Sequence, residues 1–376
     1  MGNTPTRTAE EHLGLPPGAF CSPRRDPVTP FVEELTPSLD PWQTARRLAH
    51  LPHLLCLESA FANPKLGRYS FVTADPFDWL RSRPGPSERT DPFVSLQDRL
   101  RGWCVEPVPG LPPFQGGAAG LFGYDLCHYI ERLPRSRRDE FQTPDLAVGF
   151  YDWVIAFDHA TRRTWILSTG LPQTESEPRR QRALHRLQAV KHWLTDSSPS
   201  RAWPRGESGT VSPRSLYPLP GFPGVFSNFD RPGYLAAARR AIEYIHAGDC
   251  FQVNLSQRLL HAATLEPLEL YRRLRERNPT PFAGYFDLGD FVLVSASPER
   301  FLRVEDGRVE TRPIKGTRPR GATPDEDRRQ REELLRSAKD RAENVMIIDL
   351  LRNDLGRVCE YGSVRVPAVC RLESYR

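Results

Sequence analysis

Lysine is rare in this chain, and one of its few lysines lies among arginines. Of the 52 basic residues, four are lysines and the rest are arginines. Lys315 lies in residues 312–320, which read RPIKGTRPR. A guanidinium keeps its proton in proteins, whereas an amine that loses its proton becomes a nucleophile. The composition marks Lys315 as a candidate nucleophile, and a surface lysine in a turn between Pro313 and Gly316 is the alternative.

A predicted β-hairpin precedes this lysine. An Asp-Gly pair at 306–307 separates two β-like runs, and this dipeptide is among the strongest signals for a two-residue hairpin turn. With that pair at the tip, Val304 faces Val309. The same register places Glu299 opposite Ile314.

Glu299 then lies one position from Lys315, so both side chains can reach one small molecule. A carboxylic acid beside a latent amine suits a general acid paired with a nucleophile. Pro313 cannot donate to a ladder, and we expect it to end the pairing early. The same geometry also fits a Glu–Lys salt bridge without catalytic meaning.

The size and composition indicate a folded protein of two domains or one large two-layered enzyme body. The 376 residues exceed the range in which one hydrophobic core usually keeps growing. A hydrophobic content of 39% with 26% charged residues is ordinary for a globular protein. The net charge of +5 is spread over interspersed arginines and acids, which argues against a nucleic-acid partner.

The seven cysteines are widely spaced and form no CxxC pair or Cys/His cluster. We expect them to be reduced thiols in a cytoplasmic protein. No apolar stretch approaches the roughly 18 residues of a membrane helix, and the N-terminus lacks a signal-peptide pattern. We therefore expect no membrane partner.

Composition shifts divide the chain into four parts. Residues 1–26 are polar and rich in Gly and Pro, which predicts a loose N-terminal tail. Residues 27–196 form a first region with short apolar runs cut by Pro and Gly, typical of strands. Residues 197–225 are dense in Ser, Pro, Gly and Arg and predict a linker. Residues 226–376 form the last region.

Periodicity predicts several elements and a mixed α+β fold. Apolar residues recur at helical spacing in the segments near 178–195, 232–247, 266–277 and 325–355. Strands are expected at 251–258 and 291–296.

Four ordered motifs carry a family resemblance. They are residues 247–257 (AGDCFQVNLSQ), 295–301 (SASPERF), 312–321 (RPIKGTRPRG) and 342–358 (AENVMIIDLLRNDLGRV). Together they resemble the chorismate-utilising enzymes, which include anthranilate synthase, isochorismate synthase and aminodeoxychorismate synthase component I. Upstream, 54–59 (LLCLES) and 67–71 (GRYSF) resemble the family's N-terminal region. The implied fold has two layered subdomains around an antiparallel β-sandwich core with peripheral helices, as in anthranilate synthase component I.

Within that family, the residue type at the position of Lys315 differs between the branches. The resemblance implies alanine at this position in anthranilate and isochorismate synthases and lysine in aminodeoxychorismate synthases, also called para-aminobenzoate synthase component I. It implies that Lys315 adds to the chorismate ring and is displaced by ammonia, giving 4-amino-4-deoxychorismate for folate synthesis. Glu299 would act as the general acid/base. The cationic neighbours Arg312, Arg318 and Arg320 would favour a neutral amine if they lie close.

The resemblance also implies a cofactor, substrate contacts and a partner. Glu343 matches the helix glutamate that binds Mg²⁺, and a surface helix glutamate is the alternative. Gly316 and Thr317 match a turn that contacts substrate. Ammonia would come from a separate glutamine amidotransferase subunit.

Four further residues match a tryptophan pocket of the family. They are Glu58, Ser59, Pro281 and Phe282, and plain core packing is an equal alternative. Phe282 stands where feedback-sensitive relatives have tyrosine, which argues against feedback regulation here.

The sequence ends within the family pattern, and we expect it to be truncated at the C-terminus. The resemblance implies a second metal-binding glutamate and a substrate-binding arginine beyond residue 376. We therefore expect this chain alone to be inactive and poorly stable. Anthranilate synthase, isochorismate synthase and a non-catalytic fragment that binds tryptophan or a glutaminase remain the alternative functions.

Overall fold

The computed structural model describes residues 29–61, 66–83, 91–103, 105–135, 141–196 and 216–374. The expected tail at 1–26 lies outside the described residues, as does most of the expected linker, so the predicted division of the chain stays a prediction. The fold has two compact units. The first has the bounds Met1–Arg137, Gln142–Arg201 and Leu270–Arg376, and the second has the bounds Arg138–Phe141 and Ala202–Glu269.

A seven-stranded antiparallel sheet forms the centre of the first unit. In spatial order its strands are β1 (Phe31–Glu34), β8 (Arg163–Ser168), β7 (Trp153–Asp158), β3 (Tyr69–Thr73), β2 (Leu55–Glu58), β12 (Phe282–Asp287) and β13 (Val292–Ser297). The pairing of β2 with β12 joins segments more than 200 residues apart, with Glu58 opposite Ala283. This one sheet therefore combines strands from both ends of the described chain.

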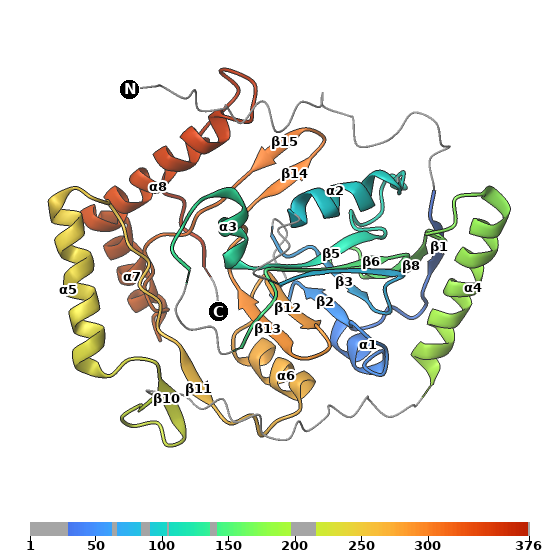
Figure 1. Ribbon diagram of the computed structural model, residues 1–376, viewed down its shortest axis with the longest axis horizontal. Coiled ribbons are helices and arrows are strands. Elements are labelled where there is room, and N and C mark those ends of the chain that lie inside the picture. The colour runs from blue at the N-terminus through green and yellow to red at the C-terminus, as the bar shows by residue number, and fades with distance from the viewer. Residues whose placement is uncertain are drawn as a thin grey trace. The chain divides into compact units, whose positions relative to one another are not determined.

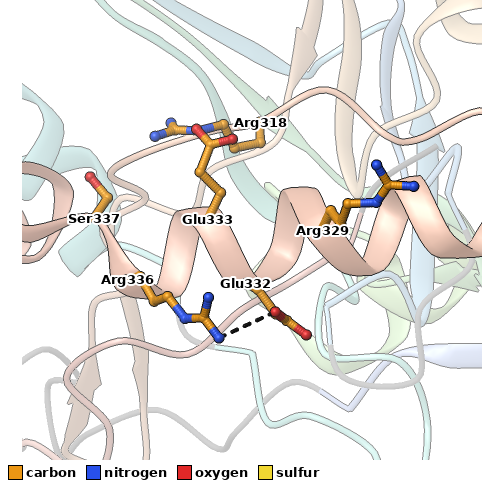
Figure 2. Close-up of a pocket in the computed structure, with 6 residues that line it drawn as sticks. All are labelled: Arg318, Arg329, Glu332, Glu333, Arg336 and Ser337. Carbon is orange, nitrogen blue, oxygen red and sulfur yellow. Dashed lines mark hydrogen bonds and ion pairs between the residues drawn. The ribbon is translucent and has the colours of Figure 1, made fainter.

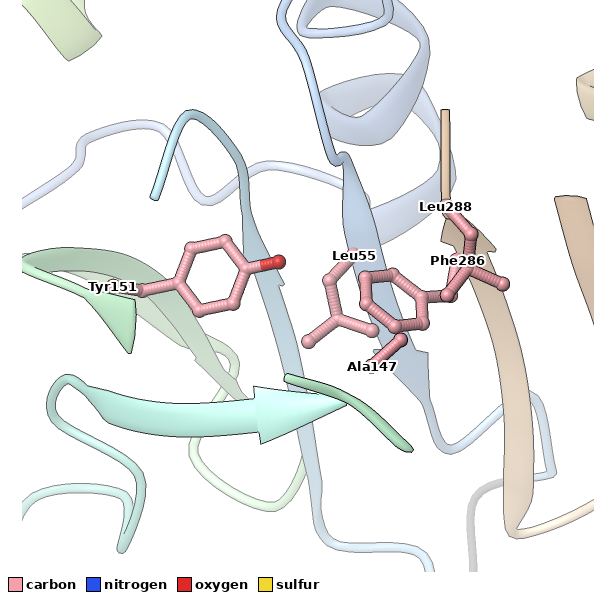
Figure 3. Close-up of a cluster of buried hydrophobic side chains, with 5 residues drawn as sticks. All are labelled: Leu55, Ala147, Tyr151, Phe286 and Leu288. Atoms are coloured by element: carbon pink, nitrogen blue, oxygen red, sulfur yellow. The ribbon is translucent and has the colours of Figure 1, made fainter. Parts of the chain in front are cut away.

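A second antiparallel sheet of three strands packs on the first. It contains β4 (Asp78–Ser82), β6 (Leu146–Tyr151) and β5 (Gly117–Phe122), with β6 in the middle. All six residues of β6 are buried, so this strand is covered on both faces. One face contributes Ala147 and Tyr151 to a cluster with Leu55, Phe286 and Leu288 (Figure 3).

Helices cover the outer faces of the two sheets. Phe93, Leu96 and Leu100 of α2 (Pro92–Arg101) pack on the other face of β6. Helices α1 (Pro41–Arg47) and α4 (Ser176–Thr195) lie side by side against the large sheet (Figure 1). The short η2 (Tyr124–Leu126) and α3 (Cys127–Ile130) follow β5. The predicted α+β fold with an antiparallel sandwich core is confirmed.

After β13, the first unit continues with a hairpin and two helices. The hairpin consists of β14 (Arg303–Glu305) and β15 (Arg308–Glu310), and the helices are α7 (Pro324–Arg336) and α8 (Ala338–Gly356). The single helix expected at 325–355 is wrong, because Ser337 has extended backbone angles between the two. Its hydroxyl accepts from the backbone N–H of Asp340 at 3.3 Å, which is how serine begins a helix.

The second unit holds a small sheet and one helix. The strands β9 (Tyr217–Pro218), β10 (Val225–Ser227) and β11 (Leu259–His261) are ordered β11-β10-β9. The expected strand at 251–258 is wrong, because the described residues there join no ladder and pairing begins only at Leu259.

The helices expected near 178–195, 232–247 and 266–277 are confirmed as α4, α5 (Arg231–Ala247) and α6 (Pro267–Arg277). Asp230 caps the start of α5, and Gly248 ends it with φ +83°. None of the helices in the described part of the chain combines the length and apolar composition that a membrane crossing requires.

Phe286→Ala tests the contact between the two sheets. Removing this buried ring should lower the free energy of unfolding by about 3–5 kcal/mol, through lost burial and the cavity left behind. Leu293→Ala is the matched control, since Leu293 is the cross-strand partner of Phe286 and is 41% exposed. Urea unfolding measures both, and equal losses would contradict the assigned core.

Candidate active site

The hairpin register places Glu299 beside Lys315, as predicted. Val304 pairs with Val309. The ladder ends before Pro313, but a carboxylate oxygen of Glu299 accepts a hydrogen bond from the backbone N–H of Ile314 at 3.1 Å. The acid is thus tied to the peptide group directly before Lys315.

Lys315 is half-buried and lies in the segment between β15 and α7. Within the described residues, its amine has neither a hydrogen bond nor an ion pair. Lys191 contrasts with it, because that amine lies 2.6 Å from a carboxylate oxygen of Glu33. Among the described residues, the Glu–Lys salt bridge that was the alternative to a catalytic role is thus not formed.

The three arginines around Lys315 are each bound to carboxylates. Arg312 pairs with Glu373, Arg318 pairs with Glu333 and Asp340, and Arg320 pairs with Asp327. The expectation that these cations favour a neutral amine stays a prediction. Each positive charge is compensated locally, so the arginines exert a weaker field at Lys315 than their number implies.

Gly316 forms a tight turn against α8. Its φ is +70°, and a Cβ there would lie 2.9 Å from Cβ of Asp340 and 3.1 Å from Cδ1 of Leu334. A glycine is therefore required by both backbone angle and space. Thr317 is exposed, and its carbonyl accepts from the guanidinium of Arg318 at 2.9 Å.

Glu343 lies one turn after Asp340 on α8 and is half-buried. Residues three apart share a helix face, so the face that touches Gly316 also carries Glu343. No hydrogen bond or ion pair to another described residue occupies its carboxylate. A free carboxylate fits a Mg²⁺ ligand, although the described residues hold no group of three acidic, His or Cys side chains suited to a metal.

A shallow hollow lies along α7, beside the Lys315 segment (Figure 2). It is lined by Arg318, Arg329, Glu332, Glu333, Arg336 and Ser337. None of the predicted site residues lines it. The lining mixes both signs of charge, with Arg336 and Glu332 3.3 Å apart, so the hollow is a solvated helix face.

The four residues predicted for a tryptophan pocket lie together at the junction of β2 and β12. The hydroxyl of Ser59 donates to the carbonyl of Tyr69 at 2.7 Å and to that of Pro281 at 3.2 Å. Phe282 begins β12, and the guanidinium of Arg300 lies 5.4 Å from its ring centre. The hydroxyl of Thr280 is buried and has no partner among the described residues.

The carboxylate of Glu58 is buried and bound by two residues that the sequence reasoning missed. Tyr271 donates to it at 2.7 Å, and the guanidinium of Arg275 donates to both oxygens, once at 2.8 Å. Burial raises the pKa of Tyr271, so its phenol remains a donor. The four-residue spacing of Tyr271 and Arg275 places both on one face of α6, a signal that sequence inspection could have used.

Burial also decides the chemistry of two groups next to Glu58. Burial raises the pKa of Cys56 well above its ordinary value, so its thiol is a core group and no nucleophile. Burial lowers the pKa of His159, whose ring lies 2.7 Å from the hydroxyl of Ser70. The five described cysteines are free, as expected.

Comparison with known proteins identifies the family. A family model described as chorismate binding enzyme matches residues 67–376. The chain belongs to the chorismate-binding enzyme family. This family membership accounts for the sandwich and for the order of the four motifs.

Curated relatives of this chorismate-binding enzyme represent two branches. Anthranilate synthase component 1 of Thermus thermophilus is 43% identical over 296 residues, which are 77% of this chain and 58% of that relative. Aminodeoxychorismate synthase component 1 of Escherichia coli is 37% identical over 340 residues, which are 88% of this chain and 69% of that relative.

A solved structure shares the fold. The crystal structure of anthranilate synthase component I from Streptococcus pneumoniae has a TM-score of 0.64 and 26% identity, over 84% of this chain and 67% of that one. Similarity alone therefore does not decide between the two branches.

Gly316→Ala tests how tightly the Lys315 turn is packed. Gly307 is the matched control, because its φ of +71° is nearly the same while a Cβ there meets nothing within 4 Å. Gly307→Ala should cost about 1–2 kcal/mol of unfolding free energy from backbone strain alone. Gly316→Ala should cost about 1–3 kcal/mol more, from the clash with Asp340. Equal losses in urea unfolding would show that the turn is loose.

Glu58→Gln tests the buried ion pair with Arg275. The substitution leaves a guanidinium of low exposure without its counter-charge, and we expect a loss of about 3–5 kcal/mol. Glu34→Gln, which breaks an exposed pair with Arg163, should cost at most about 1 kcal/mol. Thermal and urea unfolding measure both, and a small effect at Glu58 would refute its structural role.

Proposed function

We propose that this protein aminates chorismate to 4-amino-4-deoxychorismate. The observation that carries the proposal is the amine of Lys315, free of ion pairs among the described residues, next to a peptide N–H that binds Glu299. The carboxylate of Glu299 is bound at Ile314, and the amine belongs to the next residue, Lys315. An acid and an amine held this close together can act on one bound molecule. The similarity to aminodeoxychorismate synthases supports this assignment.

The proposed chemistry has two displacement steps. Glu299 gives a proton to the ring hydroxyl, which leaves as water while the neutral amine of Lys315 forms a bond to the ring system. The new nitrogen loses a proton to the carboxylate of Glu299. Ammonia then adds, the bond to Lys315 breaks, and Glu299 returns the proton to the departing amine. No electrons are exchanged with an outside group.

Glu343 would hold Mg²⁺, which when bound supplies positive charge for the carboxylates of the substrate. The chain's own contribution is the free carboxylate on the face of α8 that touches Gly316. We place Gly316 and Thr317 at the substrate, since a missing side chain and an exposed hydroxyl suit close contact.

Two partners belong to the proposal. The designation component 1 in the relatives indicates a second component, which we propose is a glutamine amidotransferase that supplies ammonia. Tryptophan is the proposed ligand at Glu58. Three donors from Tyr271 and Arg275 occupy that carboxylate, and one acceptor position remains for an ammonium group. The orphaned hydroxyl of Thr280 favours a polar ligand nearby.

Anthranilate synthesis is the second candidate, because the Thermus thermophilus relative is 43% identical. The two reactions give different products from the same substrate. Anthranilate is directly fluorescent, so product analysis separates the candidates.

Lys315→Ala in the natural full-length protein tests the amination. With chorismate, Mg²⁺ and ammonium, formation of the aminated product should fall at least about a thousandfold, as expected when a nucleophile is removed. Glu299→Gln should reduce the rate by about 10²–10⁴-fold. Lys191→Ala, on the distant α4, is the control and should retain the rate. Unchanged amination by the Lys315 variant, or anthranilate as the wild-type product, would refute the proposal.

A further inference from the structure

Asp340 connects the Lys315 turn to the helix that carries Glu343. Its side chain lies against Gly316, where a Cβ would come within 2.9 Å of Cβ and 3.0 Å of Cγ of Asp340. The same side chain is only 15% exposed. The first turn of α8 therefore packs directly on the residue after Lys315.

Arg318 ties the same turn to the carboxylate of Asp340. One guanidinium nitrogen lies 3.1 Å from the Asp340 carboxylate, and another donates to the carbonyl of Thr317 at 2.9 Å. The turn is thus held from two directions, by packing at Gly316 and by the ion pair through Arg318. Both contacts reach Asp340 of α8, while Leu334 and Glu333 of α7 add a second contact to Gly316 and to Arg318 respectively.

We propose that Asp340 is a positioning residue, which fixes the Lys315 turn relative to the helix face that carries Glu343. The inference rests on the proposed function, in which Lys315 and Glu343 act on the same substrate. Neither Asp340 nor Arg318 needs to touch that substrate. Their role is to keep the amine within attacking distance, where a displacement of 1 Å costs about a hundredfold in rate.

Asp340 keeps its negative charge at the neutral pH of an enzyme assay. A side-chain hydrogen bond with Ser337 and the positive charge of Arg318 hold the pKa of Asp340 below its ordinary value. The positive charge of Lys339 lowers the pKa of Asp340 as well. The ion pair to Arg318 is therefore formed at neutral pH.

Glu333 provides a matched comparison. Its carboxylate lies 2.7 Å from the guanidinium of Arg318 but is 62% exposed and belongs to α7. Like Asp340, it pairs with Arg318, but it is not among the atoms nearest to a Cβ at Gly316. If only the charge balance at Arg318 mattered, variants of Glu333 and Asp340 should lose activity to the same extent. If Asp340 positions the turn, the Asp340 variant should lose more activity.

Asp340→Asn and Glu333→Gln, compared in the full-length protein, test the proposal. We expect Asp340→Asn to lower kcat for amination about 10- to 100-fold with little change in KM for chorismate. Glu333→Gln should stay within about twofold of wild type, as expected for an exposed pair. Arg318→Gln should reproduce the kcat loss, and the double variant Asp340→Asn/Arg318→Gln should add little to it.

A second measurement does not depend on turnover. Acetylation of lysines with an acyl ester, followed by peptide mass spectrometry, reports how exposed each amine is. Asp340→Asn should speed acetylation of Lys315 at least about threefold over wild type and leave that of Lys191 unchanged, because only the Lys315 turn loses its support.

The outcomes separate the two claims. If amination depends on Lys315 but Asp340→Asn changes neither kcat nor labelling, the positioning role is wrong and the proposed function stands. If the protein does not aminate chorismate but Asp340→Asn exposes Lys315, the proposed function fails and the structural coupling stands. Equal effects of Asp340→Asn and Glu333→Gln would also refute the positioning role.

Discussion

The pairing of β2 with β12 is the constraint on which the rest of the fold depends. It aligns Glu58 with Ala283 and so joins a strand near the start of the described chain to one that begins at Phe282. β13 pairs with β12 in turn, and Glu299 follows two residues after its end. The position of Glu299 is therefore set by a sheet that the N-terminal region builds, and the cluster around Phe286 keeps that sheet against β6.

Two carboxylates of the first unit illustrate how burial separates structural from chemical roles. Glu58 is buried, and Tyr271 and Arg275 supply three donors to its carboxylate, so its charge is paired within the chain even with one acceptor position left open. Glu343 is half-buried and has no such partner among the described residues. A buried charge must be paired to be tolerated, whereas an accessible free carboxylate is available for a cation. The same residue type is thus held in an ion pair at one place and left without a partner among the described residues at another.

Local patterns in the sequence predicted local structure well. The Asp-Gly turn fixed the hairpin register, and apolar spacing located α4, α5 and α6. The break at Ser337 was missed because helical periodicity continues through it, while the serine side chain stabilises a new helix start instead.

Contacts between distant segments could not be predicted in this way. The pairing of β2 with β12 and the ion pair of Glu58 with Arg275 depend on tertiary packing, which no local pattern encodes. The carboxylate partners of Arg318 and Arg320 were equally invisible, so counting arginines overstated the positive charge near Lys315.

The relatives show why the reaction must be argued from the site. An anthranilate synthase and an aminodeoxychorismate synthase resemble this chain at 43% and 37% identity, so a shared scaffold serves both reactions. In the proposed reaction, the tethered amine of Lys315 would compete with free ammonia through its high effective concentration. That advantage would exist only while the turn at Gly316 holds Lys315 in place. Under the proposed function, the packing of Asp340 against this turn would therefore bear on the choice of product.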